Sequence, residues 1–407
     1  MERPEIRFKG YTDEWEQRKF GEITELKSAS RVHKDEWTSN GVPFYRSSDV
    51  MAAINGTENE KAFISEELYE KLSKVSGKLE EGDILVTGGG SVGNPYIVPD
   101  NKSLYTKDAD LLWIKNKGKF HPYFLYEFFF SPTFRNYLGS ISHVGTIAHY
   151  TITQLSDTPI CLPSFEEQKE VGEYFQSLDH LITLHQRKCD EVKSLKKYML
   201  QKMFPQNEQK VPEIRFEGFT EAWEQRKLPE FVSFFNGLTY TPDDVEETGT
   251  LVLRSSNVKN GEIIDADNVY VNDKVATSEN VQEGDIIVVV RNGSRALIGK
   301  HAQIKVSMPN TVIGAFMSGM RSEHSSFVNA LLDTSAFENE IAKNMGATIN
   351  QITGYMFSKM EFMIPSGEEQ QQIGEYFQSL DNLITLHQQK CEELKKIKKF
   401  MLQKMFV

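Results

Sequence analysis

The strongest constraint on this chain is that its sequence is written twice. Residues 3–19 recur as residues 211–227 with 12 of 17 positions identical, and residues 163–204 recur as residues 365–406 with 31 of 42 positions identical. A solenoid is excluded, because its repeats would be only about 20 to 50 residues long. The repeat therefore predicts two half-chains of about 200 residues that share one structural frame.

The segments between the repeated parts have diverged. Residues 20–160 and 228–362 are nearly equal in length but share only short motifs, such as Arg-Ser-Ser at 46–48 and 254–256 and Gly-Asp-Ile at 82–84 and 284–286. Each insert combines strand-like apolar runs with helical stretches, which indicates an α/β (α+β) fold. We expect two globular domains at residues 1–160 and 206–362, and two long helices at residues 161–205 and 363–407.

The repeated segment after each insert predicts a long helix. Its apolar residues alternate in steps of four and three, which is the heptad pattern of a coiled coil, and a Ser-x-Glu-Glu sequence after a proline predicts a capping box at its start. About 39 residues at about 1.5 Å each give a rod of about 58 Å, too long to be stabilised inside one small domain.

We therefore expect the two helices to pair in antiparallel fashion; the alternative is that each packs only on its own domain. The residues expected to pack the pair are Val171, Phe175, Leu178, Ile182, His185, Cys189, Val192, Met199, Met203, Ile373, Phe377, Leu380, Ile384, His387, Cys391, Leu394, Met401 and Met405. Lys196 and Lys398 fill the remaining stripe positions.

The histidine and cysteine on each helix stripe invite comparison with a metal site. No carboxylate or further cysteine is fixed beside them, so polar residues that set the register and small buried cysteines are the better interpretation. The chain has only three cysteines, at 161, 189 and 391, which predicts neither a disulfide framework nor a zinc site. We expect no bound metal.

The sequence offers no catalytic constellation. The glycine-rich segment 88–93 lacks the Lys-Ser/Thr of a phosphate-binding loop and is interpreted as a flexible turn. Asn94-Pro95-Tyr96 is one proline short of an amine-methylating motif, and neither a Ser-His-Asp order nor a HExxH motif is present. The chain is expected to bind rather than to transform a substrate.

Charge argues against a free-standing nucleic-acid binder. The formal net charge is −12, and the inserts themselves are acidic, at −2 for residues 18–160 and −5 for residues 226–362. No window of about 18 uncharged apolar residues and no signal-peptide pattern was found, so a cytoplasmic location without a membrane span is expected.

Together these features resemble the specificity subunit of type I restriction-modification systems. The residues that carry the resemblance are the Pro-Ser-x-Glu-Glu-Gln helix starts (163–168 and 365–370), the leading segments (16–21 and 224–229) and the Gly-Asp-Ile motifs. The resemblance covers the whole chain and implies two target-recognition domains that each read one half of a bipartite site in double-stranded DNA, with the coiled coil setting their spacing. It implies a non-catalytic role in defence against foreign DNA.

The same resemblance implies the partners and cofactors. Two modification (methyltransferase) subunits would bind this chain and carry S-adenosylmethionine, and two restriction (translocase and nuclease) subunits, where present, would use ATP and magnesium. No cofactor is expected in this chain. Because such partners can clamp the phosphates, an acidic reader that contributes base contacts is physically reasonable, and we expect it to bind DNA weakly alone.

Base contacts are expected from polar side chains on insert loops, because hydroxyl, amide and guanidinium groups match base edges. In the first domain the candidates are Arg46, Ser47, Ser48, Thr87, Gly89, Ser91, Thr146, His149 and Tyr150. In the second they are Arg254, Ser255, Ser256, Asn257, Arg291, Asn292, Ser294, Arg295, Thr348, Asn350 and Gln351. The alternative is a surface ion pair for each arginine and a turn or helix cap for each serine or threonine.

Two other functions compete with this interpretation. The first is a single-chain methyltransferase or nuclease with an unrecognised motif. The second is a scaffold whose coiled coil spaces two protein-binding domains without any nucleic acid.

Overall fold

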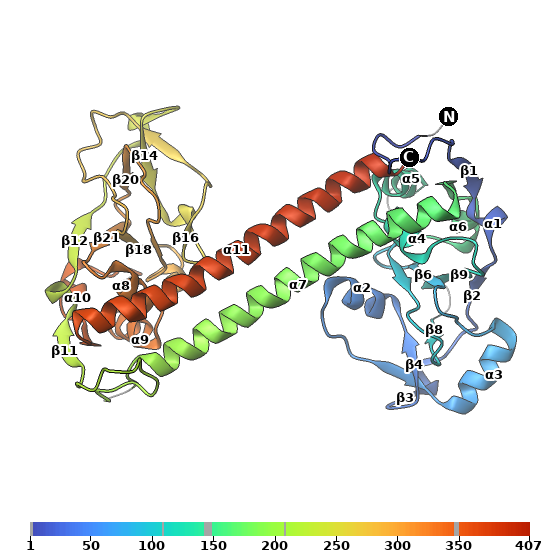
Figure 1. The fold of residues 1–407 in the computed structure, drawn as a ribbon, viewed down its shortest axis with the longest axis horizontal. Coiled ribbons are helices and arrows are strands. Elements are labelled where there is room, and N and C mark those ends of the chain that lie inside the picture. Colours follow the sequence, from blue (N-terminus) through green and yellow to red (C-terminus); the bar gives the residue numbers. More distant parts are fainter. Residues whose placement is uncertain (1–2, 108–109, 142–148, 207–208, 346–349) are drawn as a thin grey trace. The chain divides into compact units, whose positions relative to one another are not determined.

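The structure is a computed structural model, and it describes residues 3–107, 110–141, 149–206, 209–345 and 350–407. Its contacts divide the chain into two compact units (Figure 1). The first comprises Met1–Gln186 and Gln389–Val407, and the second comprises Arg187–Gln388. No helix in the described ranges is both long and apolar enough to cross a membrane.

The first unit is built on two four-stranded sheets. One has the antiparallel order β2 (Leu26–Ser28), β9 (Leu111–Ile114), β6 (Ile84–Thr87), β7 (Pro95–Ile97). The other has the order β3 (Trp37–Thr38), β5 (Ala62–Ile64), β4 (Val42–Tyr45), β8 (Tyr105–Thr106), in which β4 and β8 are parallel. A two-stranded ladder joins β1 (Glu16–Lys19) to β10 (Pro159–Leu162). The helices are α1 (Phe20–Ile23), η1 (Lys34–Glu36), α2 (Ser47–Asn55), α3 (Glu66–Ser76), α4 (Pro122–Phe128), α5 (Pro132–Ile141) and α6 (Ile152–Asp157).

The second unit repeats this plan. Its first sheet has the order β12 (Ser233–Asn236), β21 (Met317–Arg321), β18 (Ile286–Val289), β19 (His301–Gln303), and its second has β13 (Val245–Glu246), β17 (Val269–Val271), β14 (Thr250–Leu253), β20 (Thr311–Ile313). Two ladders join β11 (Glu224–Lys227) to β22 (Glu361–Ile364) and β15 (Val258–Lys259) to β16 (Glu262–Ile263). The helices are η2 (Leu228–Glu230), η3 (Pro242–Asp244), η4 (Ser255–Asn257), η5 (Arg295–Leu297), α8 (Ser325–Leu332), α9 (Ser335–Asn344) and α10 (Gly354–Phe357). Separate, mostly antiparallel sheets with flanking helices confirm the expected α/β (α+β) class.

The Gly-Asp motif directly precedes the central strand of each unit, which is β6 in the first unit and β18 in the second. Gly82 and Gly284 have positive φ angles of 84° and 93°, a conformation that favours glycine. The Asp83 carboxylate is buried and accepts from the Trp113 indole N–H at 2.7 Å. The Asp285 carboxylate is held instead by two guanidinium N–H groups of Arg321, at 2.7 and 2.8 Å. The motif is therefore a buried polar turn that ties the central strand to its neighbour.

Helices α7 (Phe165–Met203) and α11 (Gly367–Met405) contribute to both units and pair in antiparallel fashion within each. In the first unit, Cys391 lies beside the Ile182 carbonyl and Lys398 binds Asp179. Residue numbers rise along α11 as they fall along α7, so the two helices run antiparallel. All the residues that were predicted to pack the pair are buried or half-buried.

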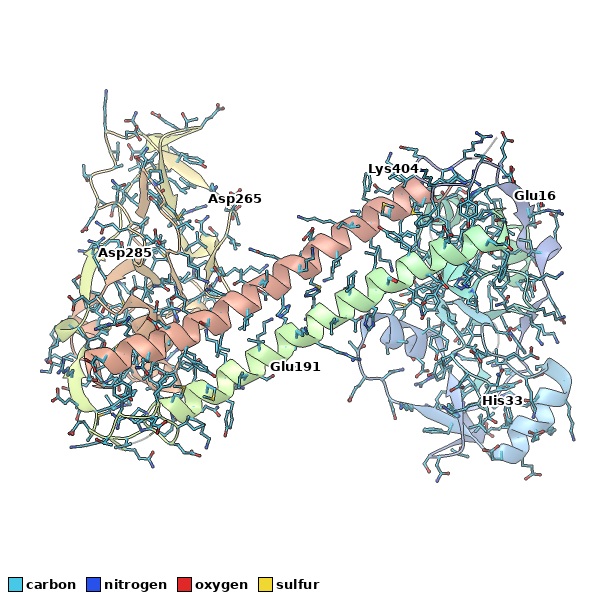
Figure 2. The ribbon with its side chains drawn as sticks, viewed as in Figure 1. Glu16, His33, Glu191, Asp265, Asp285 and Lys404 are labelled. Atoms are coloured by element: carbon cyan, nitrogen blue, oxygen red, sulfur yellow. The ribbon has the colours of Figure 1, made fainter. Side chains whose placement is uncertain are left out.

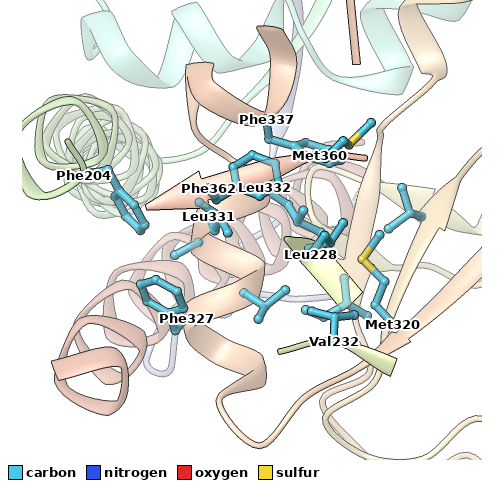
Figure 3. Packing of buried hydrophobic residues seen from close by; sticks show 14 of the residues in the cluster. Phe204, Leu228, Val232, Met320, Phe327, Leu331, Leu332, Phe337, Met360 and Phe362 are labelled. Atoms are coloured by element: carbon cyan, nitrogen blue, oxygen red, sulfur yellow. The ribbon is translucent and has the colours of Figure 1, made fainter. Parts of the chain in front are cut away.

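Each hydrophobic core combines parts of both helices. In the first unit, Phe175 from α7 and Leu402 and Phe406 from the α11 end share one cluster with Trp15. The second core has the matching set, which includes Phe204, and Figure 3 shows this side chain beside Phe327 and the strand and helix residues around it. The alternative in which each helix packs only on its own domain is therefore wrong.

The first repeated segments, residues 3–19 and 211–227, pack beside the helix starts. Arg7 makes two hydrogen bonds to the buried Glu167 carboxylate, at 2.6 and 2.8 Å, and Arg215 makes two to Glu369, both at 2.7 Å. The serine half of each predicted capping box is present, since the Ser164 hydroxyl accepts the Glu167 N–H at 3.3 Å. The glutamate half differs from a capping box, because the Glu167 and Glu369 carboxylates bind Arg7 and Arg215.

Candidate nucleic-acid interface

In the second unit, three distant segments meet beyond the end of strand β18. Arg291, in the loop after this strand, forms an isolated antiparallel bridge with Gln351. The Asn292 side-chain amide donates to the Ser255 hydroxyl at 3.1 Å, and its backbone N–H donates to the Asn350 carbonyl at 3.4 Å. Sequence-predicted residues from all three segments therefore lie in one cluster.

The outer side of this cluster is rich in hydrogen-bond donors. The Arg291, Ser294 and Arg295 side chains are exposed. The Arg291 guanidinium lies over the ring of Phe316, 5.0 Å from its centroid, and that phenylalanine is itself 55% exposed. Within the described residues, the Arg295 guanidinium has neither an ion pair nor a hydrogen bond. An exposed guanidinium can present two parallel donors to a base edge or a phosphate.

The first unit gathers its predicted residues in the same way. Gly89, in the loop after β6, forms an antiparallel bridge with His149. The Gly88 N–H donates to the Asp110 carbonyl at 2.7 Å, and the Ser47 hydroxyl donates to the same carbonyl at 3.0 Å. The side chains of Ser48, Ser91 and His149 are exposed, so they form the accessible polar part of this cluster.

The glycine-rich segment of the first unit is a turn closed by hydrogen bonds. The Thr87 hydroxyl donates to the Ser91 carbonyl and accepts the Asn94 N–H at 2.9 Å. Arg135, on α5, donates to the Asn94 side-chain oxygen at 3.0 Å, and burial lowers the pKa of this arginine. Gly93 has a φ of 75°, and a Cβ there would lie 2.7 Å from a Leu138 methyl group. The interpretation as a turn is confirmed.

Four expected base contacts need correction, because burial removes them from the accessible surface. Thr87 and Asn257 are fully buried, and their polar atoms close turns of the backbone. Tyr150 is 1% exposed and directs its hydroxyl to Thr158, at 2.5 Å. Gly89 has no side chain and its backbone is buried. These residues support the loops rather than face a ligand.

The two arginines of the Arg-Ser-Ser motifs are also occupied within their own units. The Arg46 guanidinium binds the Asp49 carboxylate at 3.0 Å and lies over the Trp37 ring. Arg254 donates to the Asp267 carbonyl, and its backbone N–H donates to the Asn257 side chain at 2.9 Å. The motif is thus a helix start, and the expectation that its arginines face DNA is corrected.

The remaining candidates are of mixed accessibility. Ser256 and Gln351 are half-buried, and Ser255 is occupied by the Asn292 amide. Thr146 and Thr348 lie outside the described residues. Sequence reasoning missed Asp110, Arg135 and Phe316, which no motif singles out and which only the packing of the loops brings to these clusters.

No metal or redox site accompanies these clusters in the part of the chain that the structure describes: it contains no group of three or more His, Cys, Asp or Glu residues that could hold an ion. The three cysteines, all within the described ranges, are buried and form no disulfide.

The sequence of the chain was compared with known proteins and matches the model of one protein family. The family model described as "Type I restriction modification DNA specificity domain" matches residues 12–194 and 220–396. The type I restriction enzyme MjaVIII specificity subunit of Methanocaldococcus jannaschii is 23% identical over 83% of this chain and 82% of that protein. The type I restriction enzyme EcoKI specificity subunit of Escherichia coli is 26% identical over 39% of this chain and 36% of that protein.

Solved structures agree on the fold. The S subunit of the type I restriction-modification system from M. genitalium superposes with a TM-score of 0.67 and 14% identity, covering 99% of both chains. A chain from a study of complex assembly and conformational transition of the type I R-M system superposes with a TM-score of 0.52 and 18% identity, covering 96% of this chain and 97% of that one.

Proposed function

Because the chain belongs to the type I restriction-modification DNA specificity family, we propose that each of its two units reads one half of a bipartite DNA site. Members of this family recognise specific DNA sequences and are not catalytic, since catalysis resides in other subunits. The observation that carries the proposal is that both units place the same loops beyond their central strand with different exposed side chains. One scaffold can thereby present two different base-reading surfaces.

The helix pair is proposed to set the distance between the two half-sites. Helices α7 and α11 are both continuous over 39 residues, and paired helices are stiff because packing along the seam supports every turn. Deleting one heptad from each helix at matching positions is expected to shorten the non-specific spacer of the recognised motif while both half-sites keep their bases.

The outer faces of the helices are proposed to dock the partner subunits. The first unit exposes Leu181, Leu184, Ile397 and Phe400, which we call the first apolar patch. The second unit exposes the repeat-related residues, Leu383, Leu386, Leu195 and Tyr198, as the second apolar patch. All eight side chains are between 36% and 57% exposed. Two patches of the same chemistry fit two copies of one partner, and we propose that these are modification subunits.

The chemistry of methylation and cleavage is assigned to those partners. We propose that S-adenosylmethionine is held by the modification subunits, that ATP and magnesium serve any restriction subunits, and that this chain contributes none of these cofactors. An acidic chain then needs its partners for phosphate contacts, so the isolated protein is expected to bind DNA weakly.

The decisive experiment is co-expression with the neighbouring modification-subunit gene, followed by mass measurement and sequencing-based mapping of methylated adenines. The expected result is a complex of two modification chains and one specificity chain that methylates one split motif. The absence of both a complex and a methylation mark would contradict the proposal and favour a scaffold without nucleic acid. A complex that methylates without sequence preference would contradict base reading by this chain.

A further inference from the structure

In each unit, one residue directly precedes the strand that pairs with the central strand (β6 or β18). These two residues, Asp110 and Phe316, have corresponding backbone positions. Asp110 directly precedes β9, and its carbonyl accepts the Gly88 N–H at 2.7 Å. Phe316 directly precedes β21, and its carbonyl accepts the Val290 N–H at 3.0 Å. In both units the donor N–H belongs to the first residue after the central strand, so Asp110 and Phe316 occupy corresponding backbone positions.

The next loop residue also corresponds between the units. Gly89 and Arg291 each form the isolated antiparallel bridge to the segment before α6 or α10. A Cβ at Gly89 would lie 3.2 Å from the Asp110 carboxylate, whereas the Arg291 guanidinium lies 5.0 Å from the centre of the Phe316 ring. In the second unit the side chains of the two positions therefore make a contact, whereas in the first unit position 89 has no side chain to face the Asp110 carboxylate.

Neither side chain is needed to build the loop. The backbone carbonyls of Asp110 and Phe316 make the structural hydrogen bonds, and any residue supplies a carbonyl. The Asp110 carboxylate pairs with Lys107 three residues away, with both side chains open to water, so the pair contributes little to stability. The Phe316 ring leaves more than half of its surface exposed, at 55%. The fold thus leaves both positions open to functional use.

We propose that this pair of positions determines which base each unit reads. In the second unit, the Phe316 ring supports the Arg291 guanidinium, whose donors match the O6 and N7 acceptors of guanine. In the first unit, the glycine leaves the Asp110 carboxylate accessible to accept from the exocyclic amino group of cytosine or adenine. Phe316 is a positioning residue for Arg291. The inference rests on the function proposed above and names specificity residues within it.

The test uses the complete complex with its modification subunits and DNA fragments that carry each base at each position of the mapped motif. Phe316→Leu keeps an apolar side chain but removes the aromatic face, and Arg291→Lys keeps the charge but removes the planar fork. Each is expected to reduce the preference for guanine at one position of one half-site by about tenfold, since a bidentate pair discriminates by a factor of roughly 5 to 150. Phe316→Tyr keeps the stack and is expected to retain the preference.

The first unit supplies an independent arm. Asp110→Asn adds a donor where only acceptors were present and is expected to change the preferred base at one position of the other half-site. Lys78→Ala removes a cation–π contact of similar geometry, 5.3 Å from the Tyr69 ring, far along the chain from both loops. This control should leave the preference unchanged at every position.

The outcomes separate this inference from the proposed function. If the wild-type complex recognises a split motif but Phe316→Leu, Arg291→Lys and Asp110→Asn leave every base preference unchanged, the inference is overturned and the proposed function stands. If the wild-type complex recognises no sequence, both fall. Thermal unfolding of each variant shows whether it is folded, and a folded Phe316→Leu protein that weakens all sequences equally would also overturn the positioning role.

Discussion

Lys398 interrupts the apolar stripe of α11 and joins three elements of the first unit. Its ammonium group donates to the Asp179 carboxylate on α7 at 2.7 Å and to Glu127 on α4 at 2.8 Å. The pairing holds the two helices in register and ties them to the globular domain. Burial raises the pKa of the Glu127 carboxyl to about 8 despite the nearby lysine, so this acid keeps its proton to a higher pH than a free glutamic acid does.

Lys196, the repeat-related lysine, has a different set of partners. It donates to Asp333 and Asp381, both at 2.6 Å, and His301 lies 3.3 Å from the other Asp333 oxygen. Burial by itself would raise the pKa of Asp333, but the hydrogen bond from His301 and the charges of His301 and Lys196 lower it to about 2. In the second unit Lys196 and His301 both lie beside the Asp333 carboxylate, whereas in the first unit Lys398 binds Glu127 and Asp179.

The first prediction concerns the Glu127 proton. Because the folded pKa of Glu127 is raised above its unfolded value near 4.3, its contribution to stability is present at low pH and is lost as the pH rises toward about 8. Glu127→Gln mimics the neutral acid and should remove that part of the pH dependence, so the variant gains stability relative to wild type between about pH 5 and pH 8.

Thermal unfolding of wild type and variant across this pH range measures the effect. Glu191→Gln, at an exposed position on α7 (Figure 2), is the matched control and should follow the wild-type curve. Parallel curves for Glu127→Gln and wild type would show that Glu127 is ionised in the folded protein.

A second prediction concerns the buried carboxylate of Glu369. Arg215→Met removes both of its guanidinium hydrogen bonds and leaves a buried charge unpaired, which typically costs about 3 to 5 kcal/mol. The double variant Arg215→Met, Glu369→Gln should recover part of this loss. Chemical denaturation of the three proteins tests it, and equal losses in the single and double variants would refute the pairing as the cause.

At the scale of elements, the long helices serve two surfaces at once. Their inner stripe enters the cores of both units, while the side chains of the first and second apolar patches stay exposed. Two helices alone cannot cover both faces, so the outward leucines and aromatics remain open for another protein. Exposed apolar faces on long helices are therefore typical of a subunit that assembles with other proteins.

The third prediction follows from the two patches. Leu184→Glu places a charge in the first apolar patch, and Leu386→Glu places one in the second. Each is expected to lower the number of bound modification subunits from two to one, by more than tenfold in affinity at the altered patch, and the double variant should bind none. Native mass measurement of the co-expressed complexes gives the count.

Val75→Glu is the control for this experiment, because Val75 is a highly exposed apolar residue on α3, outside both patches. It should leave two modification subunits bound. If Leu184→Glu and Leu386→Glu also leave two bound with wild-type affinity, the patches are not the docking sites.

At the scale of the whole molecule, each unit packs its first repeated segment, residues 3–19 or 211–227, against the end of a long helix. The Ile6 N–H donates to the Lys404 carbonyl at 3.0 Å near the end of α11 (Figure 2), as the Ile214 N–H donates to the Lys202 carbonyl at 2.9 Å near the end of α7. The repeated segments therefore perform the same packing in both units. The inserts differ in sequence and in some elements, such as α3 in the first unit and the β15–β16 ladder in the second. Both lie between equivalent paired strands, β1 and β10 or β11 and β22, which makes the inserts exchangeable in principle.

The fourth prediction tests this modularity. Replacing residues 228–360 by residues 20–158 joins the first insert to the second frame between strands β11 and β22. We expect the hybrid to fold, because Glu127 would then face Lys196, and its complex should methylate a motif with two copies of the first half-site. Methylation mapping reads the result directly. A hybrid that folds but retains the original second half-site would disprove separate reading by the two inserts.

The sequence by itself determined the repeated frame, the packing stripe of the helices, the Gly-Asp strand starts and the family. These features rest on local periodicity and on repetition, which are readable along one chain. The tertiary structure alone decided which loop residues are accessible. It buried Thr87 and Tyr150, exposed Phe316 beneath Arg291, and paired Arg7 with Glu167 across 160 residues. Burial and pairing depend on side chains brought together from distant segments, and no local pattern specifies those contacts.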